Sequence, residues 1–190
     1  MGSGERPLRA DAQRNRDQIL AAAARAFSTC GLEATLEGIA KDAGVGIGTL
    51  YRHFPTREAL HEAIMATWIE EVSAHVEKAM ATEGGCREKL LAWFEEYVSL
   101  LTRHQGAAAK ITASLGCQDS PLRTKCQTYA DANESVLTEM AEHGVLREGV
   151  DNLDVCRLLG GVATMADHSS LEAKDVRPML DVIANGVLKN

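Results

Sequence analysis

The stretch from Thr35 to Leu60 constrains the fold of this chain most, because it joins two short helical patterns through a tight turn. The first pattern has apolar residues three or four positions apart, at Ile39, Ala40 and Ala43. Thr35 stands where a hydroxyl can cap that helix, and Gly44 can take the left-handed conformation that ends it. Gly38, inside the helix, is expected to cost about 1 kcal/mol relative to alanine. The pattern predicts a helix-turn-helix.

The second helix of the pair is expected to begin near Gly46 and to end before Pro55, which cannot continue a helix. Leu50 and Phe54 lie four residues apart and can pack inward together. The side chains left on the outward face are Thr49, Tyr51, Arg52 and His53. After the proline, Thr56 is placed to cap the next helix.

This outward face has the chemistry of a helix presented to a DNA groove. Hydroxyl, imidazole and guanidinium groups donate hydrogen bonds to phosphate oxygens, which fixes the register of a protein on DNA without reading its sequence. At the leading end of the helix, Ile47 and Gly48 leave room for close approach to bases. The donors proposed for phosphates are Thr49, Tyr51, His53 and Arg57. Helix, glycine turn and helix also occur in proteins that never bind DNA, which is the competing interpretation.

The run AGVGIGTLYRHFPTREAL, residues 43–60, resembles the signature of the TetR (tetracycline-repressor-like) family of bacterial transcriptional regulators. The resemblance implies phosphate contacts from Thr35, Thr49, Tyr51, His53 and Arg57. It also implies that the residues nearest the bases are Gly46, Ile47, Gly48 and Arg52. Two positions depart from the usual pattern: lysine is commoner at position 57, and a serine or threonine cap is commoner at position 46. The first departure keeps the charge, and the second removes one hydroxyl contact.

The charge of the chain is divided unevenly along its length. The formal net charge is −7 over 190 residues, which by itself argues against binding an anion such as DNA. However, residues 1–57 carry eight Lys and Arg against six Asp and Glu, whereas residues 58–190 carry twelve against twenty-one. The attraction for phosphate is therefore expected to be confined to the N-terminal part.

Composition excludes several other classes of protein. A hydrophobic content of 45% is ample for a buried core, but no run of eighteen apolar residues exists and the first residues lack the apolar segment of a signal peptide. We therefore expect a cytoplasmic protein that does not enter membranes. The five cysteines show no CxxC spacing and the histidines no HxxxH pairing, so neither a metal site nor a cofactor is expected.

The whole chain predicts an all-α protein of about nine helices. Residues 1–56 form a three-helix DNA-binding domain, and residues 57–190 form a helical domain for ligand binding and dimerisation. Besides the helix-turn-helix pair, the expected helices cover about 11–30, 57–80, 87–103, 107–115, a stretch from 121, 151–167 and 175–188. Because the helix from Arg57 begins beside the DNA-binding residues and runs into the acidic half, it is expected to act as a lever.

Buried polar and aromatic residues suggest where an effector would bind. Asn133 falls within an apolar helical stripe, and a buried amide must be paired either by neighbouring protein groups or by a ligand. The proposed pocket consists of Trp68, Trp93, Tyr97, Tyr129 and Asn133. Aromatic residues at helical spacing are more often ordinary core than the wall of a pocket, which is the competing interpretation. Since nothing indicates an anion site, the expected effector is neutral or cationic and largely apolar.

The last two helices are strongly apolar. In the TetR family the last two long helices build a four-helix dimer interface, which the resemblance implies here. The proposed interface residues are Leu153, Cys156, Leu159, Gly160, Ala163, Met179, Ile183 and Val187.

The function predicted from these features is a homodimeric DNA-binding repressor that a small molecule releases from a palindromic double-stranded operator. One alternative is a DNA-binding regulator with a filled core and no small-molecule effector. Another is an all-α ligand carrier or enzyme. An enzyme is not expected, because no nucleophile and base, paired carboxylates or phosphate-binding glycine loop occur at a useful spacing.

Overall fold

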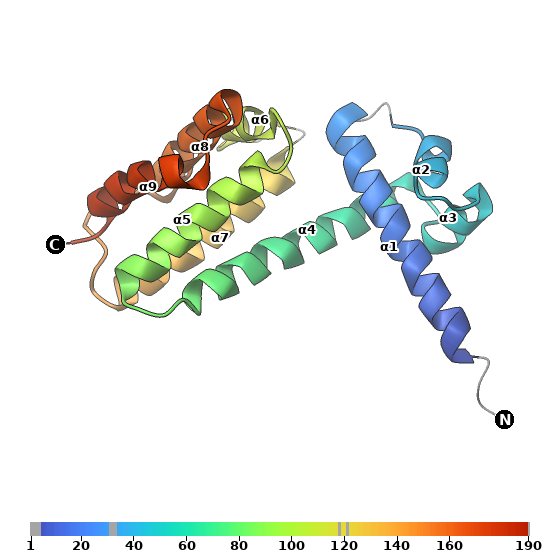
Figure 1. Cartoon of the computed structure of the whole chain (residues 1–190), viewed down its shortest axis with the longest axis horizontal. Helices are drawn as coiled ribbons and strands as arrows, with labels where there is room; N and C mark the ends of the chain where they lie inside the picture. The colour runs from blue at the N-terminus through green and yellow to red at the C-terminus, as the bar shows by residue number, and fades with distance from the viewer. Residues whose placement is uncertain (1–4, 31–33, 118, 121, 190) are drawn as a thin grey trace. The chain divides into compact units, whose positions relative to one another are not determined.

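The computed structural model describes residues 5–30, 34–117, 119–120 and 122–189, and in the first helix it describes the side chains of residues 10–27. Over these ranges the chain forms nine helices and one isolated antiparallel bridge, between Leu146 and Leu188. The all-α fold expected from the sequence is confirmed (Figure 1). The helices are α1 (Glu5–Cys30), α2 (Leu36–Asp42), α3 (Ile47–His53), α4 (Arg57–Met80), α5 (Cys86–Thr102), α6 (Ala107–Ser114), α7 (Arg123–Glu142), α8 (Asn152–Ser169) and α9 (Ala173–Val187).

Two helix starts differ from the sequence-based prediction. Helix α1 begins at Glu5 rather than near Asp11. Pro7 is compatible with this earlier start, because an N–H in the first turn of a helix has no intrahelical partner. Helix α9 begins at Ala173, with Glu172 rather than Asp175 as its cap. The Asp175 carboxylate instead accepts a hydrogen bond of 3.2 Å from the Glu172 backbone N–H, as in a capping box.

The chain divides into two compact units, Met1–Trp68 and Ile69–Asn190. In the N-terminal unit, α1 packs on α2 and α3. The largest members of its core come from all four helices: Ile19, Leu20, Ile39, Leu50, Phe54, Leu60 and Ile64. Two of these residues, Leu60 and Ile64, lie in the first turns of α4, so this compact unit includes the start of α4, and a functional domain boundary at residue 56 stays a prediction.

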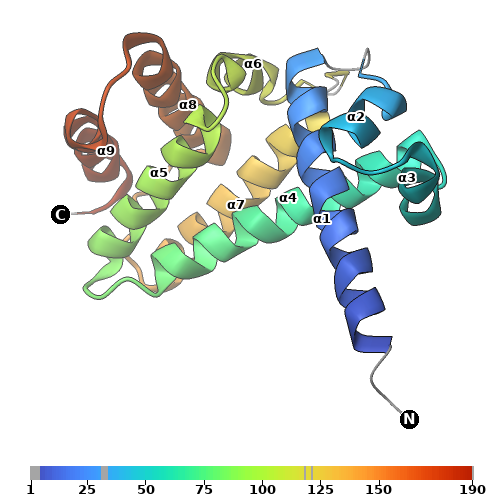
Figure 2. The ribbon, with the colours of Figure 1, turned by 45° about the vertical axis from the view of Figure 1, so that its right-hand side comes forward.

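Helix α5 lies at the centre of the C-terminal unit and contacts α6, α7, α8 and α9 (Figure 2). Eight of its side chains are buried, on more than one side of the helix, which is why its sequence is apolar over so broad an arc. They are Leu90, Leu91, Trp93, Phe94, Tyr97, Val98, Leu100 and Leu101. Across the described residues, none of the helices combines the length and the apolar character that crossing a bilayer requires.

Candidate nucleic-acid interface

The first helix of the candidate interface, α2, is capped by Thr35. The Thr35 Oγ1 accepts a hydrogen bond of 3.1 Å from the Gly38 backbone N–H. A Cβ added at Gly38 would lie 3.0 Å from that same oxygen, so the glycine leaves room for the cap. Because a hydroxyl that accepts one hydrogen bond can still donate its own proton, the exposed Thr35 keeps a donor for a phosphate oxygen.

The turn between α2 and α3 follows the geometry expected from its glycine. Gly44 has a φ of 68°, in the left-handed region. Its N–H donates to the Lys41 carbonyl at 3.1 Å, and the Val45 N–H donates to the Ala40 carbonyl at 3.0 Å, which together form a Schellman motif. Val45 packs against the core of the unit. The turn therefore fixes the direction in which α3 leaves α2.

Helix α3 buries one side and exposes the other. Leu50 and the following Phe54 are 0% and 3% exposed, so they anchor the helix in the core of the unit. On the opposite side, Tyr51 is 45% exposed, and a Cβ added at Gly48 would meet no atom within 4 Å. The other predicted contact residues on this helix and its cap are exposed or half-buried: Gly46, Ile47, Thr49, Arg52 and His53. The arrangement presents an open helical face with polar donors.

Two of the predicted contact residues bind one another. The Arg52 Nη2 donates a hydrogen bond of 3.0 Å to the Thr49 Oγ1, one turn earlier on α3. This contact holds the Arg52 side chain along the exposed face of the helix. Because the side chain is already restricted, it loses less conformational entropy when the face binds DNA. The pairing was not part of the sequence-based prediction, although a spacing of three residues on a helix allows it.

Arg57 has a different environment from the one the sequence suggested. Its Nη1 donates a hydrogen bond of 2.5 Å to the Ala34 carbonyl, and its guanidinium carbon lies 4.9 Å from the centre of the Phe27 ring. The side chain is half-buried. Arg57 therefore ties the first turn of α4 to α1 and to the segment before α2, whereas a phosphate contact from it stays a prediction.

The remaining basic residues of the unit add two observations. Arg16 places its guanidinium carbon 5.5 Å from the centre of the Phe54 ring, so it helps hold α1 against the end of α3. Lys41, in the last turn of α2, is exposed. Sequence reasoning did not single out this lysine, although its place opposite the apolar face of α2 would have indicated a solvent-facing cation. It is a further candidate for a phosphate contact.

The proposed effector residues of the C-terminal unit form a buried cluster, with Trp93, Tyr97, Tyr129 and Asn133 all 0% exposed. The Trp93 Nε1 donates a hydrogen bond of 2.9 Å to the Asn133 Oδ1, and the Asn133 Nδ2 donates one of 2.8 Å to the Asn152 Oδ1. The Asn152 amide in turn donates to the Ala130 carbonyl at 3.0 Å. The buried Asn133 amide could have been paired by a ligand or by neighbouring protein groups. In the structure it is paired by protein groups.

The aromatic rings of the cluster pack edge to face or at a tilt. The Trp93 and Tyr97 ring centres are 5.7 Å apart, and those of Tyr97 and Tyr129 are 5.1 Å apart. Burial raises the pKa of both tyrosine hydroxyls, so they stay neutral. Burial also raises the pKa of the neighbouring Cys156 thiol to about 11. This is the environment of a packed core. Trp68, the fifth predicted residue, is half-buried and belongs to the N-terminal unit.

The predicted dimer residues of α8 mostly face inward within the protomer, and their part in a dimer interface stays a prediction. Cys156, Leu159, Gly160 and Ala163 are buried within the protomer, where α8 contacts α5 and α6. A Cβ added at Gly160 would lie 2.2 Å from the Thr112 Oγ1 of α6, so the glycine permits packing within one chain. Val187 of α9 is also buried, whereas Leu153, Met179 and Ile183 are half-buried.

A different apolar face of the same two helices is exposed. Leu158 and Met165 of α8 are 56% and 41% exposed, and Val182 of α9 is 71% exposed. The spacing of seven between the two α8 residues places them on one side of the helix. Both sides of α8 are apolar, and for this reason the sequence did not distinguish its buried side from its exposed one.

Comparison with known proteins gives two family matches. Residues 19–64 match the family described as bacterial regulatory proteins, tetR family. Residues 86–189 match the C-terminal domain described as transcriptional regulator SbtR-like. The first match contains α2, α3 and the turn between them, and the second begins at the start of α5 and ends after α9.

Individual relatives resemble the chain over much of its length. The TetR transcriptional regulator SCO0520 from Streptomyces coelicolor is 34% identical, with a TM-score of 0.61 over 92% of this chain and 99% of that one. The fatty acid metabolism regulator protein of Bacillus subtilis is 26% identical over 139 residues, which are 70% of this chain and 72% of that protein. Nucleoid occlusion factor SlmA of Marinobacter nauticus is 26% identical over 121 residues, which are 63% of this chain and 62% of that protein.

Proposed function

Because the chain belongs to the TetR family of bacterial DNA-binding transcriptional regulators, we propose that it binds a pseudo-palindromic operator as a homodimer and represses transcription until a small molecule releases it. The family is not enzymatic. The open face of α3 is the main support for the proposed DNA-contact surface. On this face Tyr51 is exposed, and Arg52 is hydrogen-bonded to Thr49. Binding to an operator would take place in the cytoplasm.

The contacts proposed on this face have two roles. Thr35, Thr49, Tyr51 and His53 donate to phosphates and position the protein, whereas Arg52 and the residues Gly46–Gly48 lie nearest the bases. An arginine that binds a guanine edge discriminates against other bases by about 1–3 kcal/mol. Loss of Arg52 is therefore expected to weaken operator binding more than binding to unrelated DNA, whereas loss of Tyr51 weakens both alike.

This division of roles can be tested with the full chain. Selection from a random DNA library supplies an operator, and fluorescence anisotropy then compares operator and unrelated DNA over a range of salt concentrations. We expect Arg52→Ala to lower operator affinity about tenfold or more and to lower affinity for unrelated DNA much less, because Arg52 is assigned to the bases. Lys110→Ala, which removes an exposed cation from α6, is the matched control and is expected to change neither. Wild-type operator affinity in Tyr51→Ala, Arg52→Ala double variants would contradict the assignment.

Dimerisation is proposed through the exposed faces of α8 and α9. A partner copy would cover Leu158, Met165 and Val182, which otherwise leave apolar area in water. A two-fold dimer would also set two α3 helices on successive half-sites about 34 Å apart. A single DNA-binding domain of this size contacts too few bases to be specific, so it needs the second copy.

Release from the operator by a small molecule is the most specific part of the proposal. The Bacillus subtilis relative is named as a regulator of fatty acid metabolism, which supports a regulatory role in metabolism for this chain and leaves the effector open. A second candidate function, regulation without a small-molecule effector, is favoured at the aromatic cluster by the internally paired Asn133 amide. The two candidates differ in whether any small molecule changes the affinity for the operator.

A further inference from the structure

A cavity of about 390 Å³ opens between α5, α8 and α9, away from the paired amide of Asn133. Its volume falls within the range of roughly 300–1,000 Å³ that small-molecule sites occupy. The apolar part of its wall comes from all three helices and the segment between α8 and α9: Val98, Ala166, Leu171, Ala173 and Val176. A ligand with an apolar body would remove this surface from water.

The polar part of the wall is acidic. Asp167 and Glu95 line the cavity together with the hydroxyls of Ser99, Thr102 and Ser170, and its described lining contains no Lys, Arg or His. Glu95 is already paired with Arg177. The Asp167 Oδ2 accepts a hydrogen bond of 2.6 Å from the Gly106 backbone N–H, which fixes the carboxylate without neutralising its charge. Asp167 is therefore the principal anion that the cavity offers to a ligand.

We propose that this cavity is the effector site and that it takes a small organic cation with an apolar body, its ammonium group against Asp167. The effector role rests on the proposed function, whereas the binding site itself does not. A second hollow, on the surface of α7, is lined by polar residues of that helix and by the following His143, and most of them are exposed. No second helix gives this hollow an apolar wall, so it does not fit a cation with an apolar body.

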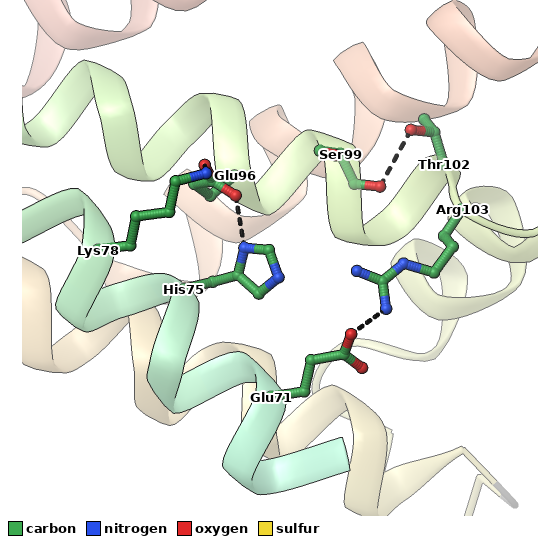
Figure 3. A network of polar contacts seen from close by, with 7 residues as sticks. All are labelled: Glu71, His75, Lys78, Glu96, Ser99, Thr102 and Arg103. Carbon is green, nitrogen blue, oxygen red and sulfur yellow. Dashed lines mark hydrogen bonds and ion pairs between the residues drawn. The ribbon is translucent and has the colours of Figure 1, made fainter. Parts of the chain in front are cut away.

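Helix α5 connects this cavity to α4. Ser99 and Thr102 line the cavity. Glu96, one turn before Ser99, and Arg103, directly after Thr102, form ion pairs with α4 (Figure 3). The α4 partners are His75 and Lys78 for Glu96 and Glu71 for Arg103. A ligand that shifts α5 must therefore change the ion pairs that hold the second half of α4. Helix α4 continues without a break to Arg57, whose side chain binds the segment before α2.

The charge of the ligand provides a test that needs no variant. Isothermal titration calorimetry of the full chain would compare 4-phenylbutylamine with the neutral 4-phenylbutanol and the anionic 4-phenylbutyrate. We expect saturable binding of the amine, at least about tenfold tighter than the alcohol, with the acid weakest. Equal affinity for amine and alcohol, or no saturation by the amine at millimolar concentration, would overturn the proposal.

Variants place the binding in this cavity. Asp167→Asn keeps an oxygen acceptor for the Gly106 N–H but removes the charge, and it should weaken amine binding about tenfold. Ser99→Leu fills the cavity from an exposed position on α5 without changing any charge, and it should also weaken binding if Asp167→Asn proves poorly folded. Glu134→Gln, on the exposed face of α7, is the control and should bind as wild type. Wild-type affinity in both cavity variants would place the amine elsewhere and overturn the assignment.

The effector role has its own readout. Operator affinity measured with saturating amine should fall at least about tenfold in the wild type, which corresponds to a coupling of about 1.4 kcal/mol, and should not change in Ser99→Leu. Saturable binding that leaves operator affinity unchanged would overturn the effector role and keep the site. A chain that binds the amine but selects no operator would instead contradict the proposed function.

Discussion

Trp93 of α5 and Asn133 of α7 are joined by a buried hydrogen bond of 2.9 Å between the indole Nε1 and the amide Oδ1. Asn133 passes the connection on to Asn152 at the start of α8, so one amide links three helices of the C-terminal unit. A polar group at this position specifies which helices pack together, which an apolar side chain of the same size would not do.

The Asn133 pairing should be visible in stability. Asn133→Leu leaves the Trp93 indole N–H and the Asn152 carbonyl oxygen without their partner, so we expect a loss of about 2–4 kcal/mol in the free energy of unfolding. Urea denaturation followed by circular dichroism, at one fixed protein concentration, measures the change. Tyr97→Phe is the contrast, because the Tyr97 hydroxyl lies buried beside the weakly bonding Cys156 thiol; its effect should stay within about 0.5 kcal/mol. A small effect of Asn133→Leu would show that the amide is dispensable.

Gly38 and Thr35 should behave as a coupled pair. Replacing a glycine inside a helix by alanine ordinarily stabilises by about 1 kcal/mol. In the wild type Gly38→Ala should fail to give this gain, because the new Cβ would lie 3.0 Å from the Thr35 Oγ1 and disturb the cap. In a Thr35→Ala background the same substitution should stabilise. Thermal unfolding of the four proteins completes the double-mutant cycle, and additive effects would argue against coupling.

Acid should weaken the contact between α4 and α5 through Glu96. Burial alone would raise the pKa of Glu96, but hydrogen bonds and charges from Lys78 and His75 outweigh burial and hold the pKa below its usual value. The stability from this carboxylate is therefore present above the pKa of an unfolded glutamate, roughly 4.3, and is lost as the pH falls through the lower folded value.

The measurement is the midpoint of urea unfolding between pH 6 and pH 3.5. The decline of the midpoint at acid pH should be shallower in Glu96→Gln than in the wild type, because the variant has no carboxylate at this position to protonate. Glu83→Gln, in the exposed turn before α5, should decline as the wild type does. Parallel curves for wild type and Glu96→Gln would show that the contact contributes no pH dependence.

The exposed face of α8 and α9 predicts where the proposed dimer can be broken. Leu158→Glu together with Val182→Glu would bury two charges from each protomer at the interface, so we expect the dimer dissociation constant to rise about a hundredfold or more. Light scattering coupled to gel filtration at micromolar concentration reports the change as monomers. Ile69→Glu alters an apolar residue of α4 that is 44% exposed, and it serves as the matched control that should remain dimeric. A double variant as dimeric as the wild type would move the interface elsewhere.

Local signals in the sequence located most helices correctly. The bounds of α4, Arg57–Met80, agree with the prediction because Pro55 and Thr56 define its start and Gly84–Gly85 follow its end. The Gly44 turn was predicted for the same reason, since a left-handed residue after a short helix strongly favours glycine. These features depend on a few neighbouring residues, and a single sequence contains them.

Features that depend on distant partners were not predictable in this way. The phosphate contact predicted for Arg57 stays a prediction, but its hydrogen bond to the Ala34 carbonyl, twenty-three residues earlier, was not predictable from local sequence. Asn133 was recognised as a buried amide, but its partners lie on other helices. The buried and exposed sides of α8 are both apolar, so periodicity indicated a buried helix without showing which side faces α5 and α6.

The close approach of α6 and α8 has a consequence for how related chains can diverge. A side chain at position 160 and the threonine at position 112 cannot occupy the same space, because a Cβ on Gly160 would lie 2.2 Å from the Thr112 Oγ1 and 2.8 Å from its Cγ2. Thr112 is itself held by a hydrogen bond of 2.7 Å to the Ala108 carbonyl. A lineage that acquires alanine at 160 must therefore shorten residue 112 or let the two helices separate. The two positions are expected to change together over evolutionary time, although they stand forty-eight residues apart in the chain.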